Sequence, residues 1–178
     1  MNTMDQQRLE YRFLIVGTLI AISATIGFAQ QVSFENGWKS IRIFQTTKTD
    51  LEKTYGEPTL VNERFLFESP NEVIEVIFSG ERCTIPKLGE RLYNLDKNTV
   101  IQYDVYLLNP TFLSQLKFNP KDYRFFRDSY HTQRARYRNP EHGVDIFTET
   151  DSDHGERVIG LRYYPTAEQE HNVTCEIK

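Results

Sequence analysis

The sequence predicts an α+β fold in which an antiparallel sheet carries short helices packed on one face. Two observations predict it: short, capped helical segments, and runs of β-branched and aromatic residues separated by turn residues. A parallel sheet would need longer crossover helices than the sequence offers. Hydrophobic residues make up 39% and aromatic residues 13% of the 178 residues, enough for the core of one domain.

The most apolar part of the chain lies near its start, and we interpret residues 1–29 as a signal peptide. Gly27 and Ala29 place small side chains where signal peptidase needs them, before a cut at Gln30. An uncleaved N-terminal anchor and a buried helix are the alternatives. A stop-transfer flank would be basic, but the next basic residue is Lys39, and a buried helix would normally show a polar face. The sequence thus predicts an exported protein, periplasmic or extracellular, whose residues 30–178 form a single α+β domain.

Export determines how the two cysteines are interpreted. The chain has an even number of cysteines, Cys83 and Cys175, and an oxidising compartment favours their pairing. Such a bridge would close a long loop and contribute about 4–5 kcal/mol in the chain-entropy model. Two buried free thiols are the alternative. Neither cysteine has the close Cys or His spacing of a zinc site, so we expect no metal there.

The first element expected after the leader is a short helix at Lys48–Tyr55. Thr47 and Asp50 have the spacing of a capping box, with an acid in the first turn. Gly56 suits the left-handed residue after a helix, and Pro58 prevents continuation. A helix this short is marginal alone in water, so we expect it to dock on another element.

A hairpin is expected next, from the runs "LVNERFLFES" and "EVIEVIFSG", with "SPNE" as the turn. In the second run, Ile74, Val76 and Phe78 share one face, which we predict to be the core face. Helix and hairpin together form a unit from Thr47 to Gly80.

The rest of the chain is expected to repeat that order. A strand with alternating apolar residues covers 99–109 and ends at Pro110. Pro120 suits the first turn of a short helix. Two or three strands follow, with turns at "NPEHG" and "DSDHGE", and Pro165 stops the last one. A helix-hairpin unit would therefore occur twice.

The segment "TTKTDLEKTYGEP" with its two following strands resembles the helix-hairpin module of the small outer-membrane assembly lipoproteins of the BamE type. The shared features are a threonine-capped helix, a Gly-x-Pro exit and a hairpin, over 46–80. The chain lacks the lipid-attachment cysteine of that type near the cleavage site. The resemblance therefore implies the module without implying an outer-membrane lipid anchor.

The region 30–178 also resembles a group of bacterial exported proteins without an assigned function. The resemblance implies a secreted or periplasmic interaction domain rather than a known enzyme. The matching segments in this chain are Gly56-Glu57-Pro58, Gly80 to Cys83, Thr99 to Leu108, and Tyr163-Tyr164-Pro165 before Cys175.

A basic and aromatic cluster, "YRFFRDSYHTQRARYR", is the strongest candidate for a binding surface. In a strand, alternate arginines line one face, where they suit an anion, a lipid phosphate or an acidic partner. The alternative is a solvated face whose arginines pair with Asp145 and Glu149 of the next strand. The candidate binding residues are Arg124, Arg127, Arg134, Arg136, Arg138 and Tyr137.

Signals for catalysis and metal binding are weaker. The sequence has no Gly-x-Ser-x-Gly turn, and both cysteines are expected in the disulfide. The acids and histidine of "DSDHGE" suit an ordinary hairpin turn and lack the calcium-loop pattern. We expect no catalytic residue, metal or cofactor.

The leading hypothesis is an exported, non-enzymatic module that binds a protein or an anionic envelope component. The net charge of −4 argues against nucleic acid as the partner. A small secreted hydrolase or an inhibitor-like module is the alternative. An enzyme should show a deep pocket with a histidine or carboxylate of shifted pKa, whereas a binding module should show a broad face rich in aromatic residues.

Overall fold

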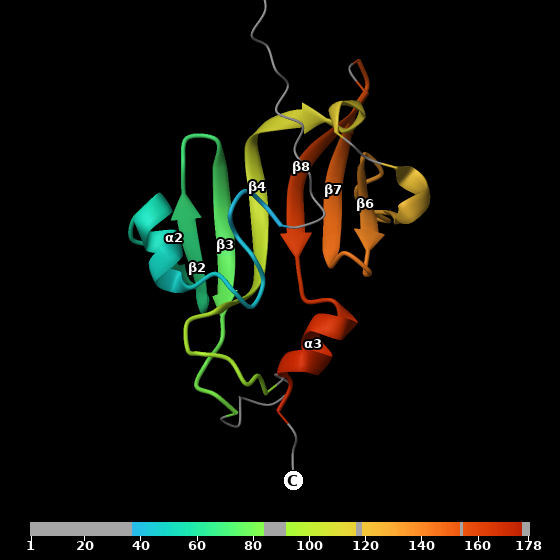
Figure 1. Ribbon diagram of the computed structural model, residues 1–178. Coiled ribbons are helices and arrows are strands. Elements are labelled where there is room, and N and C mark those ends of the chain that lie inside the picture. Colours follow the sequence, from blue (N-terminus) through green and yellow to red (C-terminus); the bar gives the residue numbers. More distant parts are fainter. Residues whose placement is uncertain (1–36, 84–91, 117–118, 154, 176–178) are drawn as a thin grey trace, which may run out of the picture. The chain divides into compact units, whose positions relative to one another are not determined.

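The computed structural model describes residues 37–83, 92–116, 119–153 and 155–175, and the predicted signal peptide lies outside them. In this part of the chain, one antiparallel sheet has the strand order β1-β2-β3-β4-β8-β7-β6-β5 (Figure 1). No helix within it is long and apolar enough to cross a membrane. The strands are β1 (Thr59–Val61), β2 (Arg64–Glu68), β3 (Glu72–Phe78), β4 (Val100–Phe112), β5 (Arg124–Arg127), β6 (Arg134–Asn139), β7 (Val144–Asp151) and β8 (Gly155–Tyr163).

The expected α+β class, with helices packed on one face and two helix-hairpin units, is wrong. The described residues form one large sheet with two short α-helices, α2 (Lys48–Tyr55) and α3 (Ala167–Val173). The helix expected at Pro120 is the three-residue 3₁₀ turn η2 (Pro120–Asp122), so the second unit does not form. Strand β8 lies between β4 and β7 and joins the two groups of hairpins through their hydrogen-bond ladders. The strand runs therefore pair with each other across the whole sheet.

Helix α2 has the bounds and the caps that the sequence predicts. The Thr47 hydroxyl accepts from the backbone N–H of Asp50 at 3.3 Å, and the Asp50 carboxylate accepts from the Thr47 N–H at 3.0 Å. Gly56 follows at a φ of 85°. Leu51 is the buried residue of α2, and the helix packs against β2 as Figure 1 shows. The predicted helix and its docking are thus confirmed.

Two strand boundaries differ from the expectation. The run expected as one strand before β3 is itself a hairpin, β1–β2, because Asn62 and Glu63 both have positive φ and form a tight turn. Strand β4 continues past Pro110 to Phe112. Its pairing with β8 shifts between Tyr106 and Thr111, and Pro110, which has no N–H, lies within that irregular stretch.

The core lies on one face of the sheet. Ile74 and Val76 of β3 are fully buried and Phe78 packs against them, so the predicted core face of this strand is confirmed. The segment before α2 covers part of the same face. The largest fully buried side chains include Tyr103, Phe67, Ile41, Ile74, Ile146 and Leu161.

A buried carboxylate joins this covering segment to the sheet. Glu72 of β3 is 1% exposed. It accepts a hydrogen bond from the Trp38 indole at 2.8 Å and another from the Tyr55 hydroxyl at 3.3 Å, and it pairs with Lys39. Burial and the Glu72 charge raise the pKa of Tyr55 to about 12. Three donors therefore satisfy a charge that would otherwise be costly to bury.

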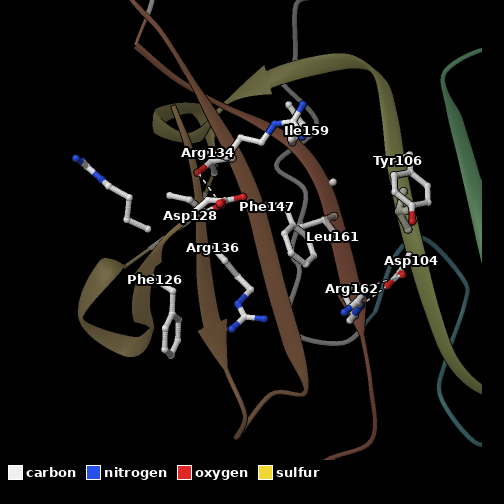
Figure 2. A pocket seen from close by; sticks show the side chains of 15 residues that line it. Asp104, Tyr106, Phe126, Asp128, Arg134, Arg136, Phe147, Ile159, Leu161 and Arg162 are labelled. Carbon is white, nitrogen blue, oxygen red and sulfur yellow. Dashed lines mark hydrogen bonds and ion pairs between the residues drawn. The ribbon is translucent and has the colours of Figure 1, made fainter. Parts of the chain in front are cut away.

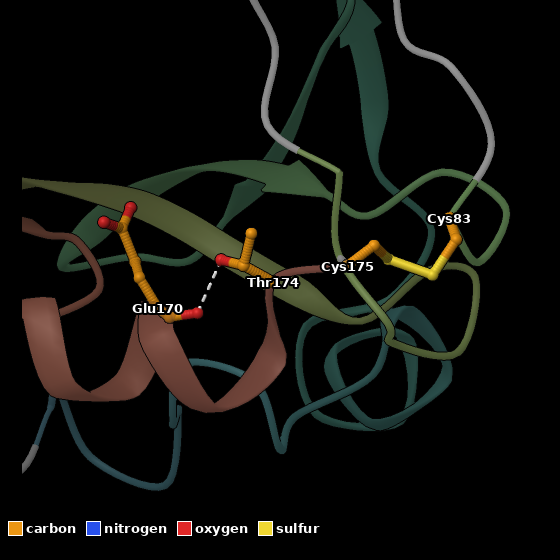
Figure 3. Close-up of a disulfide and its surroundings, with 4 residues drawn as sticks. All are labelled: Cys83, Glu170, Thr174 and Cys175. Atoms are coloured by element: carbon orange, nitrogen blue, oxygen red, sulfur yellow. Dashed lines mark hydrogen bonds between the residues drawn. A yellow bond between two sulfur atoms is a disulfide. The ribbon is translucent and has the colours of Figure 1, made fainter. Parts of the chain in front are cut away.

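The disulfide predicted between Cys83 and Cys175 is confirmed, and it closes a sequence separation of 92 residues (Figure 3). The surrounding backbone also pairs. Tyr93 and Thr174 form an isolated β-bridge, and the Asn94 N–H donates to the Val173 carbonyl at 2.7 Å. Disulfides are typical of oxidising compartments, so the bond is consistent with an exported protein.

Candidate binding groove

The face of the sheet opposite the core carries a continuous row of charged residues. Residues directly opposite each other on antiparallel strands share a face, and neighbours along a strand alternate between faces. Asp104 therefore points away from the core that Tyr103 and Val105 fill. The register aligns Glu75, Asp104, Arg162, Asp145, Arg138 and Arg124, from β3, β4, β8, β7, β6 and β5.

The aspartates of this row lie beneath arginine side chains. The Asp104 carboxylate accepts two hydrogen bonds from the Arg162 guanidinium, at 2.7 and 2.9 Å. Asp145 contacts Arg136 at 3.9 Å and Arg138 at 3.7 Å. Both carboxylates are 5% exposed, whereas the three arginine side chains are 36 to 44% exposed. The buried acids thus hold guanidinium groups at the surface.

Asp145 is held by more than its arginines. The Tyr164 hydroxyl donates to it at 3.0 Å. Burial raises the pKa of Asp145 above its ordinary value, although this hydrogen bond and the nearby arginines act in the opposite direction. The carboxylate does not line the adjacent groove. Its role in this arrangement is to position the arginines above it.

A second row on the same face explains why a groove forms there. The register aligns Tyr106, Gly160, Phe147, Arg136 and Phe126 across β4, β8, β7, β6 and β5. Gly160 contributes no side chain between Tyr106 and Phe147, and a Cβ there would lie 2.9 Å from the Val105 carbonyl oxygen. The result is a cavity of about 450 Å³ (Figure 2). Its volume falls in the range of small-ligand sites.

Guanidinium groups lie over aromatic rings at both sides of the groove. Arg136 lies 4.9 Å from the centre of the Phe126 ring, and Arg162 lies 5.5 Å from that of Phe147. Figure 2 shows Arg136 with Phe126 on one side and Arg162 bound to Asp104 on the other. Stacking of this kind fixes the plane of a guanidinium and leaves its edge available to acceptors.

The lining of the groove is positively charged. It contains four arginines and two aspartates, an excess of two positive charges on a chain whose net charge is −4. The Arg136 side chain makes no hydrogen bond to any described residue, and its only described ion pair is the 3.9 Å contact with Asp145. A guanidinium group with unused donors therefore lies in the groove wall.

The structure places the six predicted binding residues in different environments. Arg134 and Arg136 line the groove, and Arg138 lies in the neighbouring row. Arg134 pairs with Glu149 at 3.2 Å, and Arg136 and Arg138 contact Asp145. Glu149 and Asp145 are the partners expected if these arginines form a solvated face. Arg127 lines the groove from β5, and Arg124 lies at the edge strand. Tyr137 points to the opposite face, where its hydroxyl donates to Glu156 at 2.9 Å.

Several groove residues escaped the sequence analysis. Asp104, Tyr106, Phe147 and Arg162 belong to strands β4, β7 and β8, far in sequence from the arginine cluster. The alternation in β4 does place Asp104 on the polar face, which is a detectable signal. The pairing of β4 with β8 is not detectable in this way, because it depends on which strand lies beside which.

Comparison of the chain with known protein families, with curated proteins and with solved structures finds no match.

Proposed function

We propose that the protein is an exported, non-enzymatic binding module of the cell envelope or secreted space, and that its groove binds an anionic partner. The observation that carries the proposal is the Arg136 guanidinium, which stacks on Phe126 in the groove wall and makes no hydrogen bond to a described residue. Its free edge suits the paired oxygens of a carboxylate or phosphate.

The shape and chemistry of the groove favour binding over hydrolysis. Its lining includes three aromatic residues and four arginines, two residue types that are enriched in protein-binding surfaces. Asp145, whose pKa is raised, lies under the arginines and outside the lining. A partner bound here would place its acidic groups on the arginines and its apolar groups against Tyr106 and Phe147.

Two sources of such a partner share this chemistry: an acidic segment of a protein, and an anionic lipid or polymer of the envelope. The BamE-type resemblance of 46–80 supports a setting in the envelope. The groove itself requires only oxygen acceptors next to apolar surface.

The test is a titration of the oxidised protein, labelled with ¹⁵N, with a hexaglutamate peptide and separately with phosphatidylglycerol vesicles. We expect chemical-shift changes on β4–β8 around the groove. Replacing Arg134 and Arg136 by Gln should weaken binding by about tenfold, which corresponds to about 1.4 kcal/mol. A lysine-rich peptide should not bind.

The matched control replaces Arg82 and Lys97 by Gln. These two cations are also exposed and paired with acids, so the variant loses the same charge away from the groove. It should bind within about twofold of the wild type if the effect is local rather than a result of net charge. Equal weakening in both variants, or shift changes outside the groove with both probes, would contradict the proposal.

A further inference from the structure

A second cavity lies away from the groove, between the segment before α2, the β6–β7 turn and the end of β8. Its volume is about 440 Å³. The polar and aromatic residues of its lining are Arg42, Gln45, His142, Tyr163, Tyr164 and Gln169. Among the described residues of this lining there is no carboxylate. The described lining of the cavity therefore carries a permanent positive charge and no acid.

Arg42 is the source of that charge. One guanidinium nitrogen, Nη1, donates to the carbonyl oxygens of Lys39 and Ile41, at 2.8 and 2.9 Å. Arg42 forms no ion pair with any carboxylate in the described part of the chain, although the side chain is only partly exposed. The two carbonyls fix its position and leave its other donors unused. A partly buried cation in this state favours an anion as its partner.

Tyr163 provides a second unsatisfied group in the same cavity. Its ring stacks on that of Tyr103 at 4.7 Å. The Tyr103 hydroxyl accepts from the Trp38 N–H and donates to the Ile41 carbonyl, whereas the buried Tyr163 hydroxyl has no hydrogen-bond partner in the described structure. Burial raises the pKa of Tyr163, and the charge of Arg42, which lines the same cavity, acts in the opposite direction. The group stays protonated and lacks an acceptor.

The backbone around the cavity is too close to allow larger residues. A Cβ on Gly37 would lie 2.3 Å from the Ile41 carbonyl oxygen, and one on Gly143 would lie 2.2 Å from that of Tyr164. Both glycines also have positive φ. The Gly143 contact holds the β6–β7 turn against the end of β8, and the Gly37 contact lies within the segment that carries Arg42.

We propose that this cavity is a binding site for the carboxylate or phosphate group of a small organic anion. Arg42 supplies the charge and the fork of donors, and the Tyr163 hydroxyl donates to an anion oxygen after a small side-chain adjustment. His142 lines the rim of the site and contacts the body of the ligand. This site is independent of the groove, which lies on the other face of the sheet.

The experiment is a residue-resolved NMR titration of the oxidised protein with inorganic phosphate, with succinate and with neutral succinamide. We expect phosphate and succinate to shift the amide signals of 37–45, 142–143 and 163–169, and succinamide to leave them unchanged. Arg42→Gln should raise the Kd about tenfold or more, and Tyr163→Phe should raise it by a smaller factor. Arg82→Gln, which removes an equal charge elsewhere, should leave the Kd unchanged.

Arg42→Lys is the second variant, because Arg42 also hydrogen-bonds the backbone. This variant keeps the charge but loses the planar set of guanidinium donors. We therefore expect a folded protein with a Kd between those of the wild type and Arg42→Gln. The double change of Arg134 and Arg136 to Gln should leave binding at this cavity intact, which separates this proposal from that for the groove. Shifts scattered over the surface, equal shifts with succinamide, or an unchanged Kd in folded Arg42→Gln would overturn the proposal.

Discussion

The Asp104 carboxylate accepts two hydrogen bonds from the Arg162 guanidinium across strands β4 and β8, at 2.7 and 2.9 Å. This pair joins the two halves of the sheet at their one non-sequential strand contact. It also forms one wall of the groove. A single interaction therefore contributes both to the assembly of the sheet and to the candidate site.

Replacing Asp104 by Ala should lower the free energy of unfolding by about 2 kcal/mol. Breaking a fully buried ion pair costs about 3–5 kcal/mol, and the partial exposure of Arg162 reduces that loss. Urea denaturation followed by circular dichroism measures the change. Glu149→Ala is the control, because its pair with Arg134 is exposed on both sides and should contribute less than about 0.5 kcal/mol. Equal losses in the two variants would contradict the assignment.

Asp145→Asn should be nearly neutral, or stabilising, at pH 7. Burial raises the folded-state pKa of Asp145 above the ordinary 3.8, so the folded state binds the proton more tightly than the unfolded state. Stability contributed by this group is present at low pH and is lost as pH rises from 3.8 through the folded pKa. The asparagine variant should remove the contribution of this group to the slope of the free energy of unfolding against pH. Urea midpoints measured from pH 3 upward test it, and an unchanged slope would show that Asp145 titrates normally.

The hydrogen bond from Trp38 to Glu72 should show coupling in a double-mutant cycle. Trp38→Phe leaves one acceptor position of a buried carboxylate unsatisfied, which we expect to cost about 1–3 kcal/mol, with a further loss from reduced packing. Glu72→Gln and the double variant complete the cycle, and the coupling energy should be about 1 kcal/mol. Circular dichroism is used to follow unfolding, because Trp38 is the one tryptophan of the chain and its fluorescence is lost in the Trp38→Phe variant. Additive losses would mean that the bond contributes nothing.

Reduction of the disulfide should destabilise the protein by up to about 4–5 kcal/mol, the value expected from closing a loop of this length. The loss should be visible first at the C-terminal end, where the Tyr93–Thr174 bridge and α3 depend on Cys175 for their position. Hydrogen exchange should show lower protection there, while β7 and β8 remain protected. An unchanged urea midpoint under reducing conditions would contradict this.

Local features of the fold were predictable because nearby residues determine them. The bounds of α2 follow from Thr47, Asp50 and Gly56, which lie within one short segment. The core face of β3 follows from alternation alone. The same reasoning could have found α3, since Thr166 and Gln169 form a capping box that the sequence analysis overlooked.

Strand lengths and helix content were less predictable. The helix expected at Pro120 has the correct first residue, but its segment contributes no buried side chain and forms a single 3₁₀ turn. The β1–β2 hairpin was missed because its turn residues, Asn62 and Glu63, lie inside a run that is otherwise typical of a strand. The Pro120 segment lacks the packing that would support a longer helix, and the positive φ of Asn62 and Glu63 ends the first strand.

The sequence by itself determined the capped helix α2, the alternating faces of β3 and the pairing of Cys83 with Cys175. Each of these depends on spacing, on residue type or on an even cysteine count. Only the tertiary structure decided that β8 lies between β4 and β7, and hence that Arg162 and Asp104 meet across the groove from Arg136. The physical reason is that residues on separate strands become neighbours through register, and register is set by the burial of the whole opposite face.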